Sequence, residues 1–212
     1  MAFKDLGKSL IDTVMKAGAT ELLADYREIG LDAITTDEIL KEVPVLGTLI
    51  KLGKIGSSIR DYRFAKRLYT FLLALNQTSD SDRAEFSSRM NEDQKVKEKV
   101  GEVLITFIDR FDESEKTEML AKAFQAFLQS AIDLPTFIRM GRSIDRCMCS
   151  DLEKIPNDTN PTTLLGDSVF DLAGCGIIEI RGVPTIGAVG TPTSYQLTEF
   201  GKQFRAIVME RA

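Results

Sequence analysis

The chain has 212 residues, of which 43% are hydrophobic and 28% are charged, a composition typical of a globular protein with a filled core. Its formal net charge of −5 argues against a surface built throughout for binding nucleic acid. It contains no histidine, so catalytic triads and zinc sites that need an imidazole are excluded.

The cysteines indicate a reducing compartment. There are three of them, Cys147, Cys149 and Cys175, and an odd number without a secretory signal argues against a disulfide framework. No stretch reaches the roughly 20 apolar residues that a membrane span needs. We therefore expect a cytoplasmic protein with free thiols.

The first third of the chain is predicted to form short helices. Apolar residues recur at helical spacing from Phe3 to Met15. The sequence Thr35-Thr36-Asp37-Glu38 matches a capping box, so a helix is expected to begin there. Pro44 should interrupt that helix soon after Leu40, because proline cannot donate a backbone hydrogen bond.

The segment 43–67 is the least ordinary part of the sequence. Residues 43–56 are apolar and glycine-rich, and lysine is their only charged residue. Residues 57–75 are predicted to form an amphipathic helix with two distinct faces. Its apolar face carries Phe64, Leu68, Phe71, Leu72 and Leu75, and another face carries Arg60, Arg63, Lys66 and Arg67.

Further helices are predicted over 82–90, 92–111, 114–129 and 133–152. Asp133 with Pro135 is a typical helix start, and acidic residues between 109 and 115 are expected to cap helix N-termini. Residues 157–160 then interrupt the helical pattern. This break predicts a helical bundle domain over 1–155 and a second module over 160–212.

The second module has a different pattern. A helix is predicted from Pro161 to Ala173, followed by strands over 176–181 and 194–197. Residues 182–193 are rich in Gly, Pro and Thr and are predicted to form the loop between the strands. A terminal helix is expected over 198–211, with Thr198 as its N-cap.

The residues Gly176-Ile177-Ile178-Glu179 and, after the loop, Tyr195-x-Leu197-Thr198-Glu199-x-Gly201 resemble a winged-helix module. The resemblance covers about the last quarter of the chain. It implies a helix that ends at a glycine, a two-stranded wing and a final helix. The expected fold class is therefore mainly α, a helical bundle with a small C-terminal winged-helix-like α+β module.

In DNA-binding winged-helix proteins, the helix before the first strand enters the major groove. Here that helix carries Asp167 and Asp171 and no Lys or Arg, and Arg181 is the nearest cation. Carboxylates at this position would repel phosphates rather than bind them. Protein binding is therefore favoured over DNA binding, and nucleic acid is an unlikely partner.

The helical part is similar to uncharacterised bacterial proteins of about this size. The runs Val100-Gly101-Glu102 and Ile144-Asp145-Arg146 carry this resemblance. It implies a bacterial origin and a similarity to components of phage-defence systems and mobile elements.

The sequence offers candidate zinc, calcium, anion and phosphate sites, and each has a simpler structural interpretation. The three cysteines offer thiolates for zinc, but a structural site normally needs a fourth ligand, so free thiols are favoured. Asp109, Asp112, Glu113 and Glu115 lack the spacing of a calcium loop, so helix capping is favoured.

Arg139, Arg142, Asp145 and Arg146 suggest an anion site or, more simply, a solvated helix face. No Gly-Lys-Ser/Thr sequence closes the glycine-rich run, which argues against a phosphate loop.

The basic face of the helix 57–75 leaves three alternatives open. First, it could be the solvated side of a buried hairpin. Second, the segment 43–67 could bind an anionic membrane surface. Third, the basic face could bind an acidic protein or nucleic-acid partner. We predict a non-enzymatic interaction or effector protein that binds a protein partner or itself, with no cofactor or metal. Its expected partner-binding residues are Arg60, Arg63, Lys66, Arg67, Asp167, Asp171 and Arg181. The rival functions are a membrane-active, pore-like effector and a winged-helix transcriptional regulator.

Overall fold

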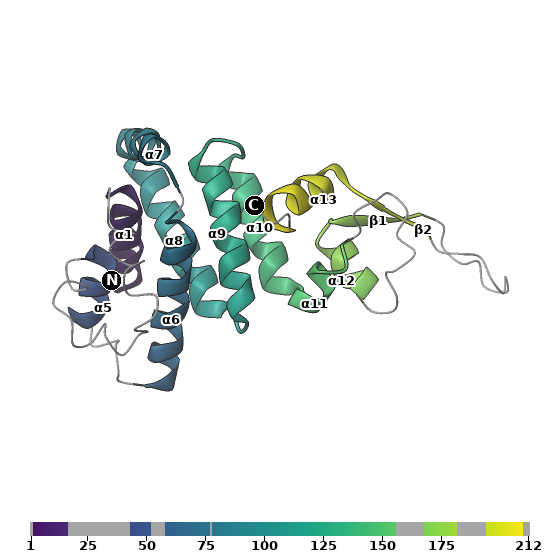
Figure 1. Ribbon diagram of the computed structural model, residues 1–212, viewed down its shortest axis with the longest axis horizontal. Coiled ribbons are helices and arrows are strands. Elements are labelled where there is room, and N and C mark those ends of the chain that lie inside the picture. Colours follow the sequence, from purple (N-terminus) through teal and green to yellow (C-terminus); the bar gives the residue numbers. More distant parts are fainter. Residues whose placement is uncertain are drawn as a thin grey trace. The chain divides into compact units, whose positions relative to one another are not determined.

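The computed structural model describes residues 2–16, 43–51, 58–76, 78–155, 168–181 and 194–209. The chain divides into two compact units, Met1–Ile138 and Arg139–Ala212, and Figure 1 shows their elements. The described residues are mainly helical, with one two-stranded antiparallel sheet, so the predicted mainly α class is confirmed. The division at Ile138 differs from the predicted boundary at 155–160, which marks a change of sequence pattern rather than of compactness.

Unit 1 contains α1 (Ala2–Met15), α5 (Pro44–Lys51), α6 (Ile59–Ala74), α7 (Asp80–Glu92), α8 (Gln94–Arg110), α9 (Ser114–Leu128) and the start of α10 (Leu134–Arg146). The predicted helix that Pro44 should interrupt lies outside the described residues, and Pro44 itself is the first residue of α5. At this position the missing N–H costs nothing, since it would have no partner within the helix. The capping box at 35–38 lies outside the described residues.

Short polar side chains set where these helices begin. Ser58 accepts a hydrogen bond from the Asp61 amide, and Ser79 accepts one from the Asp82 amide. Asp93 accepts from two amides of the first turn of α8. As a result α7 begins two residues before the predicted Asp82, and α8 begins two residues after the predicted Glu92.

A cluster of phenylalanines fills the core of unit 1. Its members come from α6, α7, α9 and α10, and their ring centroids lie 5.6–6.0 Å apart. They are Phe71, Phe86, Phe124, Phe127 and Phe137, all of them buried. Tilted and edge-on contacts of this kind add to the free energy gained from burying the rings.

Helices α1 and α8 approach each other closely enough for their backbones to touch. A Cβ added to Gly7 would lie 2.7 Å from the carbonyl carbon of Gly101, and a Cβ on Gly101 would lie 2.5 Å from the Gly7 oxygen. The two glycines therefore permit this crossing.

A buried guanidinium joins neighbouring elements, because Arg83 donates to the carbonyls of Val14 and Leu75 at 2.7 Å each.

Unit 2 contains the rest of α10, α11 (Cys149–Leu152), α12 (Ser168–Gly174), β1 (Ile178–Arg181), β2 (Ser194–Leu197), α13 (Glu199–Phe204) and a π-helical turn, Arg205–Met209. The strands pair antiparallel, with Ile178 opposite Leu197 and Arg181 opposite Ser194. The second strand matches the predicted 194–197, and the first begins two residues later than predicted. The loop 182–193 lies outside the described residues.

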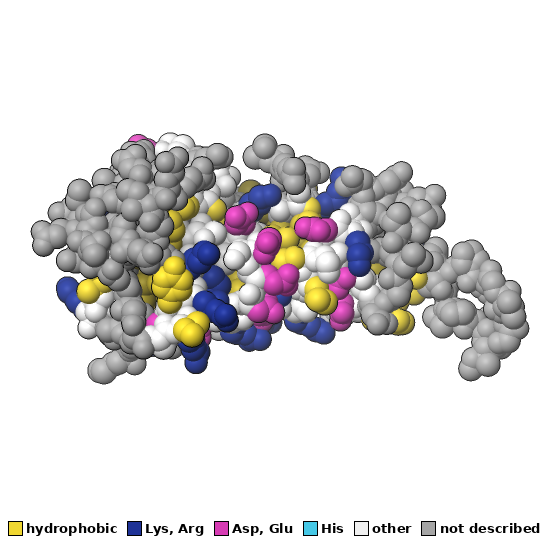
Figure 2. Space-filling view, turned by 60° about the horizontal axis from the view of Figure 1, so that its bottom comes forward, with side chains coloured by type: hydrophobic (Ala, Val, Ile, Leu, Met, Phe, Trp, Pro, Cys, Tyr) yellow, Lys and Arg dark blue, Asp and Glu magenta, His cyan; other side chains and the backbone are white. Residues whose placement is uncertain are grey.

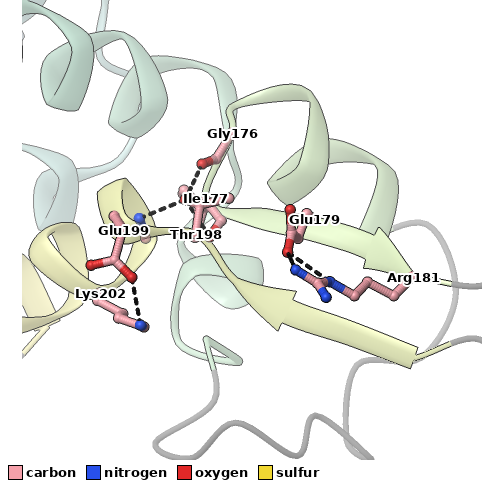
Figure 3. Close-up of polar contacts among 8 residues, drawn as sticks. Gly176, Ile177, Glu179, Arg181, Thr198, Glu199 and Lys202 are labelled. Atoms are coloured by element: carbon pink, nitrogen blue, oxygen red, sulfur yellow. Dashed lines mark hydrogen bonds and ion pairs between the residues drawn. The ribbon is translucent and has the colours of Figure 1, made fainter.

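The junction between the strands and α13 is held by polar contacts, shown in Figure 3. Thr198 donates its hydroxyl to the Gly176 carbonyl at 2.6 Å and accepts from the Gly201 amide at 2.9 Å. Its amide donates to the Ile177 carbonyl at 3.0 Å. Gly176 has a φ of +71°, a conformation that favours glycine. The residues that carry the winged-helix resemblance are thus the ones that hold this junction together.

Candidate functional site

A cleft of about 720 Å³ opens in unit 1 beside the N-terminal half of α6. Its other wall is formed by the end of α8 and the connection to α9. Four cations and two carboxylates line it together with apolar side chains. The lining residues are Ile59, Arg60, Arg63, Lys66, Arg67, Asp109, Phe111, Asp112 and Ser114.

Helical spacing explains why α6 presents its cations together. Phe64 and Leu68 are buried on the inner face of the helix, and positions three or four residues apart share a face. The predicted basic residues Arg60, Arg63 and Lys66 are exposed, and the structure brings all four predicted cations into the lining of one cleft.

Arg67 is the half-buried residue among the four cations, and its hydrogen bonds go to the backbone of α8. Its Nε donates to the Ile108 carbonyl at 2.7 Å, and a terminal nitrogen donates to the Asp109 carbonyl at 3.1 Å. These carbonyls belong to the last turn of α8 and have no partner within the helix. Burial lowers the pKa of Arg67, which the nearby Asp109 opposes and Arg63 reinforces.

Arg60 forms an ion pair with Asp109 at 3.0 Å. The Arg60 side chain is 79% exposed, so water screens the pair and its contribution to stability is small. Such a pair exchanges easily for another carboxylate. Arg60 therefore remains accessible to a ligand.

The second carboxylate of the lining, Asp112, is bound by Lys116. The Lys116 amine lies 2.9 Å from Asp112 and 3.3 Å from Glu113. The hydrogen bond from Lys116 lowers the pKa of Asp112. Glu113 stands at the N-cap of α9, as predicted, but its side chain makes no cap hydrogen bond.

Arg63 and Lys66 differ from Arg60 and Arg67, because neither forms an ion pair or hydrogen bond with another described residue. Two large apolar side chains are exposed on the same helix, Ile59 at 76% and Tyr62 at 44%. Figure 2 shows Lys and Arg side chains gathered beside hydrophobic ones on this face. We call Ile59, Tyr62, Arg63 and Lys66 the open face of α6.

The other predicted partner-binding residues lie in unit 2 or outside the described residues. Asp167 falls outside them. Asp171 is exposed on α12, beside Phe170, which is 70% exposed. Arg181 on β1 forms an ion pair with Glu179 of the same strand. The structure therefore does not gather these residues into one site within unit 2.

The apolar segment that suggested membrane action is partly in the core. Val45, Leu46 and Leu49 of α5 are buried, and α5 contacts α1. Residues 52–57 lie outside the described residues. Within the ranges that are described, no helix is both long enough and apolar enough to cross a membrane.

A buried polar cluster in unit 2 has a structural explanation. Ser168 donates to Asp151 at 2.6 Å, and Lys154 lies 3.2 Å from the Ser168 hydroxyl and 3.3 Å from Asp151. The Ser168 hydroxyl donates to Asp151 and accepts from Lys154, so its proton points to the carboxylate and not to the amine. The cluster joins α11 to α12.

The remaining candidates for chemistry are also accounted for by the fold. The guanidinium of Arg139 lies 3.8 Å from the centroid of the Phe200 ring, a cation–π contact. None of the three cysteines forms a disulfide bond. Among the residues that the structure describes, no three His, Cys, Asp or Glu side chains are placed to hold a metal ion.

In comparisons with known proteins, no family model matches the chain, and no curated protein or solved structure matches it either. The winged-helix and bacterial resemblances therefore stay predictions.

Proposed function

We propose that the chain is a non-enzymatic interaction protein that binds an acidic segment of a protein partner in the cleft beside α6. The observation that carries this proposal is the open face, where Arg63 and Lys66 have no ion-pair partner among the described residues and stand beside exposed Ile59 and Tyr62.

Charge supports an acidic ligand. The chain as a whole carries −5, whereas four cations and two carboxylates line the cleft. A local positive potential on an acidic protein attracts negative segments and orients them on approach. Asp109 and Asp112 already have cationic partners, Arg60 and Lys116, so the free positive charge belongs to the open face.

The apolar residues support a protein partner. Aromatic and arginine side chains are enriched at protein interfaces and carry much of the binding free energy. Tyr62 and Arg63 supply both kinds of side chain, and Ile59 supplies an aliphatic contact. A ligand with Asp or Glu next to a Leu, Ile or Phe fits this combination.

The shape of the site favours a peptide over a lipid surface. A flat anionic bilayer would meet the carboxylates of Asp109 and Asp112 along with the cations, whereas a single acidic side chain can enter the cleft beside Arg63 and Lys66. Membrane action would also require the buried side chains of α5 to leave the core.

Selection from a random-peptide library against the full chain tests the proposal. Selected peptides should be rich in Asp and Glu with an adjacent apolar residue, and their binding should weaken with rising salt. Arg63→Glu/Lys66→Glu should weaken binding by about tenfold or more. The matched control is Lys95→Glu/Lys99→Glu, which makes the same charge change at exposed positions of α8.

Two results would overturn the proposal: selected peptides without acidic enrichment, or equal binding by the two double variants. A parallel arm uses vesicles of phosphatidylserine and phosphatidylcholine. Vesicle binding that is lost in Arg63→Glu/Lys66→Glu, without any peptide selection, would establish the membrane alternative instead.

We infer further that unit 2 is a winged-helix-like module that binds protein. The antiparallel pair β1–β2, the preceding α12 and the Thr198-capped α13 support this inference. The described helix α12 carries exposed Phe170 and Asp171 and no cation, which suits a protein surface better than a DNA groove. A gel shift of duplex DNA by micromolar protein at low salt would contradict it.

A further inference from the structure

Two thiols in unit 2 lie in direct contact, although they are 28 residues apart in the sequence. Cys147 directly follows α10, and Cys175 follows α12 in the turn that leads to β1. Their sulfur atoms are 3.3 Å apart. Cys147 is fully buried, whereas Cys175 is half-buried and so remains accessible to small reagents.

Backbone hydrogen bonds hold the two cysteines in place. The Cys147 amide donates to the Ser143 carbonyl at 3.1 Å, and the Cys175 amide donates to the Asp171 carbonyl at 3.0 Å. The same Asp171 carbonyl lies 3.9 Å from the Cys147 sulfur. The sulfur contact is thus set by the ends of two helices and not by a free loop.

The two thiols have different acidities. The hydrogen bond from Cys147 lowers the pKa of Cys175 to about 7, against the effect of burial and with help from the nearby Arg146. The hydrogen bond to Cys175 and burial raise the pKa of Cys147. Of the two thiols, Cys175 therefore carries the larger share of thiolate near neutral pH, and the thiolate is the reactive form.

We propose that Cys147 and Cys175 form a modification site, a dithiol that a peroxide converts reversibly to a disulfide. The contact between the sulfurs carries this proposal, because a disulfide needs them about 2.05 Å apart and they begin at 3.3 Å. The accessible Cys175 meets the oxidant, and the buried Cys147 resolves the product.

The reaction balances in two steps. The Cys175 thiolate attacks one oxygen of hydrogen peroxide, the O–O bond breaks, and hydroxide leaves and is protonated to water. The Cys147 sulfur then attacks the Cys175 sulfenic acid and the S–O bond breaks. The departing hydroxide takes the Cys147 proton as a second water. Two thiols lose two electrons, and one peroxide is reduced to two waters.

The disulfide would join the end of α10 to the turn after α12. It would close the chain segment between residues 147 and 175, which includes α11 and the predicted break at 157–160. Closing a loop of this length restricts the unfolded chain, so the oxidised protein should show a higher thermal midpoint for unit 2. Reduction by an excess of a small dithiol should restore the original midpoint.

The test is oxidation of the full chain with hydrogen peroxide, followed by intact mass and titration of free thiols. We expect a mass loss of about 2 Da and the loss of two of the three thiols, reversed by dithiothreitol. Cleavage after Lys and Arg leaves Cys147 and Cys149 on one peptide, so Cys149→Ala is needed to assign the bond. This variant should still form the disulfide, whereas Cys147→Ala and Cys175→Ala should not form a bond between these two positions.

Different results would overturn the proposal. A mass gain of about 16 Da or more in the Cys149→Ala chain, without the loss of 2 Da, would show oxidation without pairing. Retention of all three thiols in the folded wild-type chain would show that the site does not react. A bond that still forms in Cys147→Ala but is lost in Cys149→Ala would place the pair elsewhere.

Discussion

Substitution of Gly201 by alanine tests the packing of unit 2 most directly. A Cβ at this position would lie 1.9 Å from the Ile177 carbonyl oxygen and 2.8 Å from its carbon, both of them backbone atoms. Real Cβ atoms do not approach other atoms within 3.0 Å, so α13 and the residue before β1 would have to separate by about 1 Å.

That separation also disturbs hydrogen bonds. The Ile177 oxygen accepts from the Thr198 amide at 3.0 Å and from the Thr198 hydroxyl at 3.2 Å. Overpacking costs about 1–3 kcal/mol, and each weakened hydrogen bond adds about 1 kcal/mol. We expect Gly201→Ala to lower the free energy of unfolding by about 2–5 kcal/mol, which for a unit of this size lowers the midpoint by roughly 10 °C or more.

The chain has no tryptophan, so far-ultraviolet circular dichroism is the assay of choice for both thermal and urea unfolding. Gly174→Ala is the matched control. A Cβ on Gly174, the last residue of α12, would meet only the Arg146 guanidinium at 3.5 Å, an ordinary contact. The control should be neutral or slightly stabilising, by up to about 1 kcal/mol. Equal stability of the two variants would refute the reasoning about this contact.

Three further substitutions test unit 1. Gly7→Ala should cost about 1–3 kcal/mol in urea unfolding, because its Cβ would lie 2.7 Å from the Gly101 backbone, and an unchanged midpoint would contradict that crossing. Arg83→Met should cost about 2–4 kcal/mol, because it removes the guanidinium from the Val14 carbonyl and leaves the Leu75 carbonyl with only the Thr78 amide as donor, and a loss below about 0.5 kcal/mol would show that water replaces the guanidinium. Lys116 lowers the pKa of Asp112, so the carboxylate stabilises the fold above its unfolded pKa near 3.8 and loses this effect as the pH falls through its folded pKa. Asp112→Asn should therefore be less stable than wild type at neutral pH and equal to it in strong acid, and a constant difference in urea midpoint would refute the pairing.

Much of the helical fold could be predicted from the sequence because the signals are local. The apolar positions of α6, α8 and α9 follow helical spacing, and the Asp133 carboxylate accepts from the Thr136 amide at the start of α10 as its sequence indicated. Helix ends were less predictable. Ser79 caps α7 before the predicted Asp82, because the four successive residues Ser79, Asp80, Ser81 and Asp82 all offer caps and only the packed helix selects one.

The cleft itself could be predicted only in part. Helical spacing placed the four cations on one face, but their partners come from the end of α8, some 40 residues away. Only this tertiary contact distinguishes Arg67, which binds the carbonyls of Ile108 and Asp109, from Arg63. The exposure of Ile59 was also not predictable, since isoleucine is among the residue types most often buried.

The cysteines illustrate the same limit. Considered on one continuous helix, Cys147 and Cys149 point apart, and Cys175 is distant in sequence. The structure ends α10 at Arg146 and begins α11 at Cys149, so Cys147 lies between helices and meets the turn after α12. No periodicity signals such a contact, because it depends on where two helices end in space.

The division of roles among the α6 cations explains how one helix serves both fold and binding. Arg67 is half-buried and binds the last turn of α8, which fixes the helix against its neighbour. Asp109 belongs to that turn, and its carboxylate is paired with Arg60. Asp109 therefore does not neutralise Arg63 and Lys66. Arg63 and Lys66 are left facing solvent beside the exposed apolar side chains of Ile59 and Tyr62. The same contact that builds the cleft therefore keeps its outer cations available to an acidic partner.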